Sequence, residues 1–334
     1  MAATKQLTLQ VPSMTYDIMR PFLEKRVPIE GVEIQIGQAP VMIYKDEPTL
    51  REGNFGLADL NLGYWPQAIE QGWEIVALPV FSKRKGAYQF IFVRTDRGIE
   101  SPKDLEGKVV ASRSYGTSLT IWARGLLRER FGVDISKMRW VVWVKDHFPV
   151  YATPQNGGKG DGTFEPELFR DPQKSVVNAL LDGDVDAMIT DISDGEAIRA
   201  LKASPNVRRL FPSYQAEDER LYREEGIYTP VHLMVMSKKL DRARPELAMQ
   251  LYQAFEKSKE MAYTDILNDR AGFGVLYLRE HMEEQIEKWG DPFKYGITAN
   301  KRTIDSYIRF NAEQGHIRAP LAYELLFAGS TLDT

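Results

Sequence analysis

Three consecutive cations, Lys83, Arg84 and Lys85, follow Ser82 after an apolar run that ends at Phe81. A guanidinium presents a planar pair of donors that matches a carboxylate, so Arg84 is the strongest candidate for holding an acid, with Lys83 beside it. A solvated turn without any ligand explains the same residues. The pattern therefore predicts a carboxylate site at the end of a strand, and a plain surface turn is the alternative.

A run of small polar residues opens the clearest helical pattern of the chain, which covers residues 117–130. The run contains Tyr115, Gly116, Thr117 and Ser118. The first backbone N–H groups of a helix and its dipole favour a bound anion, so we expect these residues to contact the substrate. Ordinary helix capping would select the same small hydroxyl residues.

His232 lies inside an apolar run, residues 232–236. Because an imidazole exchanges protons near neutral pH, this side chain is a candidate proton donor. A histidine packed in the core of a strand is the alternative. His147 is a weaker candidate for the same role, whereas His281 and His316 lie in charged helical surroundings that predict surface positions.

The composition argues against several kinds of chemistry. The chain has no cysteine, and therefore no disulfide, thiolate ligand or cysteine nucleophile. The HExxH, Walker, GxGxxG and GxSxG motifs do not occur in their expected contexts, so we expect neither a metal nor a cofactor. The chain has 43 basic and 47 acidic residues, and this net charge of −4 gives no excess of positive charge for binding the phosphates of nucleic acid. A cofactor-free reaction or simple binding of a small molecule remains.

Short apolar runs alternate with longer helical patterns, which predicts an α/β fold with mostly parallel sheets. Residues 151–169 lack periodicity and are rich in Gly and Pro, so we expect a long loop there. The clearest helices cover residues 117–130 and 245–263. The predicted strands are residues 7–11, 32–36, 75–80, 90–93, 109–111, 140–144 and 232–236.

The two halves of the chain repeat one pattern. Around Gly53 and Gly183, the end of a helix is followed by a glycine, an apolar residue two positions on, and a strand. Two βαβαβ halves explain this repeat.

Ligands of such open sheets lie beyond the carboxyl ends of the strands, so the corresponding loops should face one cleft. These loops are residues 13–16, 59–64, 114–118 and 190–194. They add Tyr16, Asp59, Asn61 and Asp191 to the candidate site. Capping of the following helices is the alternative explanation for each polar residue.

The chain crosses between the two predicted lobes twice, through residues 90–110 and 226–240. Two crossings make a hinge, and the helices from Pro245 onward return to the first lobe. We therefore expect the two-lobed architecture of type II periplasmic binding proteins. Each lobe would be a doubly wound, mostly parallel sheet, with the ligand cleft between the lobes. Lobe I would comprise residues 1–95 and 229–334, and lobe II residues 96–228.

The N-terminal residues 1–13 lack the apolar stretch of a secretory signal, and no window approaches the roughly 20 apolar residues of a membrane span. We therefore expect a cytoplasmic protein without a membrane partner. The sequence does not decide whether the protein forms a homo-oligomer.

The chain resembles the 4,5-dihydroxyphthalate decarboxylase family, cytoplasmic relatives of periplasmic solute-binding proteins. This resemblance implies the two-lobed fold and a decarboxylation without a cofactor. It also implies roles for Arg84, Tyr115, Arg124 and His232, which match residues of the family at the same motifs. The matching stretches, which together span nearly the whole chain, are ALPVFSKRKGAYQFIFVRTDRGIESPKDLEGKVV, YGTSLTIWARGLLRERFGVDISKMRWV, VRRLFPSYQAEDERLYREEGIYTPVHLMVM and GDPFKYGITANKRTIDSYIRFNAEQGHI.

The chain departs from the family pattern in the predicted cleft. Ser82-Lys83-Arg84 and then Ala87-Tyr88 stand where the family usually has Pro-Ser-Arg followed by Arg-His. Asp59-Leu60-Asn61-Leu62-Gly63 stands in place of Glu-Met-Ser-x-Ser, and Val142 in place of a glutamate.

The residues and the resemblance together predict a decarboxylase of a hydroxylated aromatic carboxylic or dicarboxylic acid. Arg84 and the residues 115–118 would hold carboxylates, and His232 would donate a proton to the ring. Asp59, Asn61 and Tyr88 would orient the ring hydroxyls. The alternative is a non-catalytic solute-binding protein for a small aromatic carboxylate.

Overall fold

A computed structural model describes residues 6–37, 43–158, 162–192 and 194–334 of the chain. These residues form two compact units, and each unit contains both strands and helices. The first unit consists of the chain up to Arg84, Pro230–Lys301 and Leu321–Thr334. The second unit consists of Lys85–Thr229 and Arg302–Pro320.

The first unit contains two groups of paired strands. β1 and β2 pair in parallel, and β12 pairs antiparallel with β3, β4 and β5. The helix α11 begins in this unit and ends in the second. The elements are β1 (Leu7–Val11), η1 (Asp17–Met19), α1 (Arg20–Leu23), β2 (Val32–Ile36), α2 (Ile43–Glu52), β3 (Leu57–Asn61), α3 (Trp65–Glu70), β4 (Ile75–Ala77), β5 (Lys83–Arg84), β12 (Pro230–Ser237), α8 (Lys238–Ala243), α9 (Leu247–Leu267), α10 (Leu278–Trp289), α11 (Ile297–Glu313), α12 (Tyr323–Leu326) and η6 (Gly329–Thr331).

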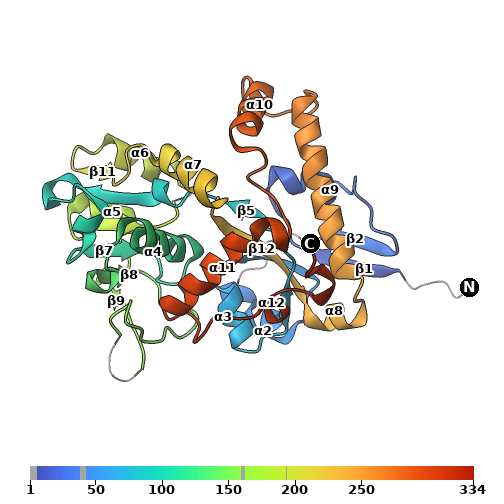
Figure 1. Ribbon diagram of the computed structural model, residues 1–334, viewed down its shortest axis with the longest axis horizontal. Helices are drawn as coiled ribbons and strands as arrows, with labels where there is room; N and C mark the ends of the chain where they lie inside the picture. Colours follow the sequence, from blue (N-terminus) through green and yellow to red (C-terminus); the bar gives the residue numbers. More distant parts are fainter. Residues whose placement is uncertain (1–5, 38–42, 159–161, 193) are drawn as a thin grey trace, which may run out of the picture. The chain divides into compact units, whose positions relative to one another are not determined.

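The core of the first unit forms where the apolar face of α9 meets the short helix α1. Leu247, Leu251 and Phe255 lie on this face and are fully buried. The ring of Phe255 packs on that of Phe22, with 4.6 Å between the centroids. Figure 1 shows α9 as a long orange helix with α10 beside it, and the two helices are in contact. The spacing of apolar residues at every third or fourth position explains why this segment is helical.

The second unit contains a mixed sheet with the strand order β11-β6-β10-β7-β8-β9 within the described residues. The pairs β10–β7, β7–β8 and β8–β9 are parallel, and β6 runs antiparallel to β10 and β11. The elements are η2 (Tyr88–Phe90), β6 (Ile91–Arg94), η3 (Thr95–Arg97), η4 (Pro102–Leu105), β7 (Val109–Ser112), α4 (Ser118–Phe131), η5 (Ile135–Lys137), β8 (Arg139–Val142), β9 (Glu167–Leu168), α5 (Val176–Asp182), β10 (Ala187–Ile189), α6 (Gly195–Ala203), β11 (Val207–Arg209) and α7 (Tyr214–Glu225).

The repeat found in the sequence corresponds to one local structure in each unit. α2 ends at Glu52 before Gly53, and α5 ends at Asp182 before Gly183. Both glycines have a positive φ, +69° and +83°, a backbone conformation that residues with a side chain rarely adopt. A strand, β3 or β10, then follows each glycine. The glycines therefore end a helix and turn the chain into a strand at both places.

Two features differ from the sequence-based expectation. The sheet around β12 is antiparallel rather than mostly parallel, because apolar runs indicate which strands are buried but not their direction. Residues 302–320, expected in lobe I, pack within the second unit.

The expected loop 151–169 contains the short strand β9. Residues 159–161 of this loop lie outside the described residues, as does Ser193 of the loop 190–194. In the part of the chain that is described, no helix has the length and apolar character needed to cross a membrane.

Candidate active site

The carboxylate of Asp59 and the imidazole of His232 form a pair in the first unit. Asp59 lies on β3 and His232 on the neighbouring strand β12, and His232 Nδ1 is 2.9 Å from Asp59 Oδ2. The Asp59 side chain is 8% exposed and that of His232 is 26% exposed. A carboxylate at Nδ1 fixes the orientation of the ring and leaves Nε2 to face a substrate.

Two hydroxyl groups complete the surroundings of Asp59. Tyr16 Oη donates to Asp59 Oδ2 at 2.7 Å, and Ser82 Oγ donates to Oδ1. Burial would raise the pKa of Asp59, but the neighbouring His232 and the hydrogen bonds lower it below its usual value. Burial and the nearby carboxylate raise the pKa of Tyr16, so its hydroxyl keeps the proton that it donates. Asp59 therefore remains ionised.

The strand register places Asn61, His232 and Lys83 in one row. Asn61 on β3 lies opposite His232, and Lys83 on β5 lies opposite it on the other side. Residues directly opposite in an antiparallel pair point to the same face of the sheet. Lys83 Nζ also lies 5.9 Å from the centroid of the Tyr16 ring. An amide, a proton donor and a cation therefore share one face.

The structure corrects the expected role of Asp59. It accepts hydrogen bonds from Tyr16, Ser82 and His232, which occupy both of its oxygens. It therefore orients the imidazole rather than a ring hydroxyl of a substrate. Asn61 Oδ1 accepts the N–H of Gly63 at 3.0 Å and so supports the turn before α3.

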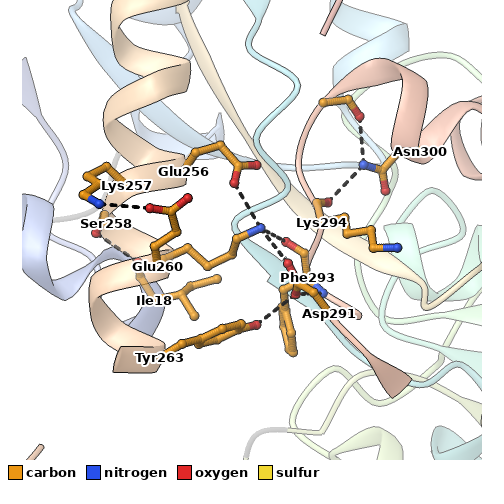
Figure 2. Close-up of polar contacts among 12 residues, drawn as sticks. Ile18, Glu256, Lys257, Ser258, Glu260, Tyr263, Asp291, Phe293, Lys294 and Asn300 are labelled. Carbon is orange, nitrogen blue, oxygen red and sulfur yellow. Dashed lines mark hydrogen bonds and ion pairs between the residues drawn. The ribbon is translucent and has the colours of Figure 1, made fainter. Parts of the chain in front are cut away.

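Arg84 does not have the geometry of a carboxylate clamp. The residue is 6% exposed, and its Nη2 donates to the carbonyl of Lys294 at 2.9 Å and to Asn300 Oδ1 at 2.6 Å. Figure 2 shows Asn300 donating to the same carbonyl of Lys294. The guanidinium thus fixes the loop before α11 and the first turn of that helix. The local sequence could not reveal these hydrogen bonds, because the partners are more than 200 positions apart. Lys83 is the cation of this turn that shares a face with His232.

Tyr88 belongs to the core of the second unit, contrary to the expectation that it orients a hydroxyl of the substrate. It is fully buried, and its ring packs on Phe211 and Phe131 with centroid distances of 4.8 and 6.0 Å. Three aromatic side chains in contact explain the burial without any ligand.

The segment before α4 binds a carboxylate that the chain itself supplies. Gly116 N–H donates to Asp146 Oδ1 at 2.5 Å, so this donor is occupied by Asp146 rather than by an external anion. Burial raises the pKa of Asp146 to about 6. Thr117 Oγ1 lies 2.6 Å from Thr120 Oγ1, and Ser118 is the buried first residue of α4. The contacts of Gly116 and Thr117 are therefore made within the chain, although the Thr117 side chain forms no capping hydrogen bond to α4.

Tyr115 is a core residue beneath a buried arginine. Its ring is fully buried and lies 3.5 Å from the Arg124 guanidinium carbon. Arg124 Nε donates to Gln314 Oε1 at 2.7 Å, and Arg124 Nη2 lies 3.0 Å from His316 Nε2. His316 is 1% exposed, so the expected surface position is wrong. Burial and the Arg124 charge lower the pKa of His316 well below its usual value. Sequence analysis missed this network because it joins residues far apart in the chain.

Asp191 lies just after β10 in the second unit. Its Oδ1 is 2.5 Å from Lys85 Nζ, so this carboxylate has an internal cation as partner. His281 is exposed, as expected. Within the described residues, no group of three or more His, Asp or Glu side chains is placed to hold a metal ion.

A protein-family model identifies the wider relationship. The model described as "ABC transporter, phosphonate, periplasmic substrate-binding protein" matches residues 16–263. The chain belongs to this family.

Curated relatives narrow the comparison within this periplasmic substrate-binding family. The chain is 26% identical over 348 residues to a 4,5-dihydroxyphthalate decarboxylase of Comamonas testosteroni, and the alignment covers 98% of each chain. A 4,5-dihydroxyphthalate decarboxylase of Pseudomonas putida is 29% identical over 142 residues, which are 41% of this chain and 53% of the relative. The resemblance inferred from the sequence is thereby confirmed.

Solved structures confirm the binding-protein fold of this family member. A putative periplasmic sulfonate-binding protein SsuA from Methylobacillus flagellatus KT matches with a TM-score of 0.55 and 12% identity, over 96% of this chain and 90% of that chain. The aliphatic sulphonate binding protein SsuA from Escherichia coli matches with a TM-score of 0.52 and 12% identity, over 97% and 92%. At such low identity these likenesses concern the fold alone. The ligand cleft expected between the lobes stays a prediction.

Proposed function

We propose that this protein is a cofactor-independent decarboxylase of a hydroxylated aromatic carboxylic acid, and that 4,5-dihydroxyphthalate is the first substrate to test. The observation that carries the proposal is the His232–Asp59 pair, in which a half-buried imidazole is oriented by an ionised carboxylate. Two curated relatives named 4,5-dihydroxyphthalate decarboxylase support it.

The chemistry requires a proton at the ring carbon that bears the carboxylate. The proton on His232 Nε2 is transferred to this carbon while a ring hydroxyl ortho or para to it releases electron density into the ring. The bond between the ring and the carboxylate then breaks. CO2 leaves, and the electron pair of that bond restores the aromatic ring. In sum, one carboxylate and one proton become one arene hydrogen and one CO2.

The other side chains on this face hold and orient the acid. Lys83 lies opposite His232 in the sheet, so its ammonium group is suited to hold the carboxylate near the donor. Tyr16 and Ser82 act through Asp59, because their hydroxyls fix the carboxylate that orients the imidazole. They are positioning residues rather than catalytic residues.

Substitution of His232 tests the proposal. We expect His232→Gln to lower the turnover number for CO2 release by about 10²- to 10⁴-fold with little change in substrate binding, because glutamine keeps a hydrogen-bonding group but does not titrate. CO2 release and loss of ring absorbance measure turnover, and the melting temperature controls for folding. A destabilised variant with the wild-type rate per folded molecule would show that His232 only packs.

A non-catalytic solute-binding protein for a small aromatic carboxylate is the second candidate. The family model, which describes a periplasmic substrate-binding protein, favours it. The same assay separates the two functions, because tight binding of aromatic acids with no release of CO2 from any of them would support the binding protein.

The compartment is part of the same proposal. We assign the decarboxylase to the cytoplasm, where the resemblance places its relatives, whereas the family model describes a periplasmic protein. Fractionation of the native host, with antibodies against this chain, measures the location. Recovery in the periplasm would favour the solute-binding function.

A further inference from the structure

A cavity of about 500 Å³ lies in the second unit, apart from the residues assigned above to proton transfer. It opens at the carboxyl ends of β7 and β10, which pair in parallel. Arg113 directly follows β7 and Thr190 directly follows β10, and both line the cavity. Pockets for small molecules commonly have volumes of roughly 300–1,000 Å³. The size therefore suits a ligand with a single ring.

The cavity lies where the order of the strands reverses. From β7 the chain continues through α4 to β8 and then β9 on one side of β7. From β9 it returns through α5 to β10, on the other side of β7. Open α/β sheets bind their ligands at such a reversal, beyond the carboxyl ends of the strands. Topology and volume thus indicate the same place.

Arg113 supplies a cation to this cavity. Within the described part of the chain, its exposed guanidinium forms no hydrogen bond or ion pair. Its backbone is fixed, because its carbonyl accepts the N–H groups of Trp143 at 3.1 Å and Val144 at 2.9 Å. A guanidinium on a fixed backbone is suited to bind a carboxylate with two parallel hydrogen bonds.

Thr190 supplies a hydroxyl. The residue is 7% exposed, and among the described residues its hydroxyl has no hydrogen-bond partner. Val177, Ile192 and Ala197 contribute apolar surface to the same cavity, which suits the faces of a ring. The Thr190 hydroxyl is not among the fully buried side-chain atoms that lack a partner in the described residues, so it is accessible to a polar ligand.

The acidic residues that line the cavity already have partners within the chain. Asp191 pairs with Lys85 at 2.5 Å, and Asp194 accepts the N–H of Glu196 at the start of α6. Glu196 Oε1 lies 4.0 Å from Arg199 Nη2, in an exposed pair. These carboxylates therefore leave the guanidinium of Arg113 available to an anion.

We propose that this cavity binds a small aromatic carboxylic acid, with the carboxylate on the Arg113 guanidinium and a second polar contact from the Thr190 hydroxyl. The aromatic class of the ligand rests on the proposed function. The site itself rests on the cavity, the strand order and these two side chains.

Calorimetric titration with phthalate tests this site. Phthalate has the ring and the carboxylates but lacks the hydroxyl groups that decarboxylation needs, so binding is measured without turnover. We expect Arg113→Gln to weaken phthalate binding by about 10- to 100-fold, and Thr190→Val to weaken it by at least about threefold. Arg199→Gln is the matched control, because Arg199 lies on α6 but does not line the cavity. It should bind phthalate within about twofold of the wild type.

Circular dichroism and thermal unfolding confirm that each variant is folded. If Arg113→Gln does not fold, Thr190→Val and a crystal structure of the wild type with phthalate decide the question, because the carboxylate must lie against Arg113. Wild-type affinity in both variants, or no binding of phthalate by the wild type at millimolar concentration, would overturn the inference.

Release of CO2 from 4,5-dihydroxyphthalate separates this inference from the proposed function. If phthalate binding depends on Arg113 but no CO2 is released, the cavity is a binding site and the decarboxylase proposal fails. If CO2 is released and Arg113→Gln changes neither phthalate binding nor KM, the decarboxylase stands and the cavity proposal fails.

Discussion

At the scale of single residues, Asp59 decides how His232 can act. Both oxygens of this carboxylate accept hydrogen bonds, and one of them contacts His232 Nδ1 at 2.9 Å. A neutral amide at the same place could not hold the imidazole in the same way, because one of its two polar atoms is a donor. The orientation of the proton donor therefore depends on the charge of Asp59.

We predict that Asp59→Asn lowers the turnover number for decarboxylation by about 10²- to 10⁴-fold and changes KM less than threefold, since the amide disturbs the orientation of the proton donor more than substrate binding. It should also change the pH dependence of turnover, because the carboxylate at the imidazole is lost. Ser82→Ala is the control, since it removes one hydrogen bond and keeps the charge, and it should lower turnover by less than about tenfold. Equal losses in both variants would mean that Asp59 only supports the fold.

A second residue-scale prediction concerns the buried Lys259 on α9. Its ammonium contacts Asp291 at 2.8 Å and Glu256 at 3.3 Å, and its side chain is 6% exposed. Figure 2 shows Tyr263 reaching the same Asp291 carboxylate. We expect Lys259→Met to lower the free energy of unfolding by about 3 kcal/mol, because two carboxylates lose their buried cation.

Urea denaturation measures this loss. Lys257→Met is the matched control on the same helix, because Lys257 is 61% exposed and its pair with Glu260 is a surface pair. That control should change the free energy of unfolding by less than about 1 kcal/mol. A similar loss in the two variants would contradict a special role for the buried pair.

At the scale of elements, α7 holds the segment that follows β5. Asp218 on α7 accepts the backbone N–H groups of Ala87 and Tyr88, and a Cβ on Gly86 would lie 1.9 Å from its Oδ2. Burial is the main cause that raises the pKa of Asp218 to about 7. Only glycine fits at position 86, because the carboxyl group fills the space of a side chain.

The raised pKa of Asp218 predicts how stability changes with pH. Between its usual pKa of 3.8 and about 7, the folded protein keeps a proton that the unfolded chain has released, so this group's contribution to the free energy of unfolding falls as pH rises. We expect Asp218→Asn to be relatively more stable at pH 8 than at pH 5 when each is compared with the wild type. Chemical denaturation at both pH values measures this, and an identical pH dependence of the two proteins would refute it.

The elements also show what the sequence could predict. The limits of β1 and β2 agree with the predicted strands, because apolar runs bounded by polar residues are local signals. The direction of β12 is set by partners far away in the chain, so no local pattern could reveal it. In the site, the position of His232 within a strand could be predicted from the sequence. The partners of Asp59, Arg84 and Arg124 could not, because they depend on contacts between distant segments.

At the scale of the whole molecule, the chain passes between the two units after Arg84, Thr229, Lys301 and Pro320. The segment 302–320 completes the second unit, because Tyr307 and Phe310 pack on Trp122 and Gln314 accepts from the buried Arg124. Gly125 lies so close to Phe310 that a Cβ would be 2.2 Å from its ring. The second unit is therefore incomplete without a piece from near the C-terminus.

We predict that residues 85–229 do not fold alone, whereas the same residues joined to 302–320 by a flexible Gly/Ser linker do. Without this segment the Arg124 charge loses its buried partners. Circular dichroism during heating should show a cooperative transition only for the joined fragment. Replacing Gln314 and His316 by Ala in that fragment should lower its melting temperature, and cooperative unfolding of 85–229 alone would contradict the prediction.

The same division of the chain governs folding during synthesis. A ribosome releases β3, β4 and β5 long before β12, the strand that pairs with all three. It releases most of the second unit before residues 302–320, and the segment 321–334 of the first unit after them. The first unit lacks β12 and the second lacks residues 302–320 until long after their other strands have emerged, so apolar strand edges stay exposed during this interval and are open to association with other chains.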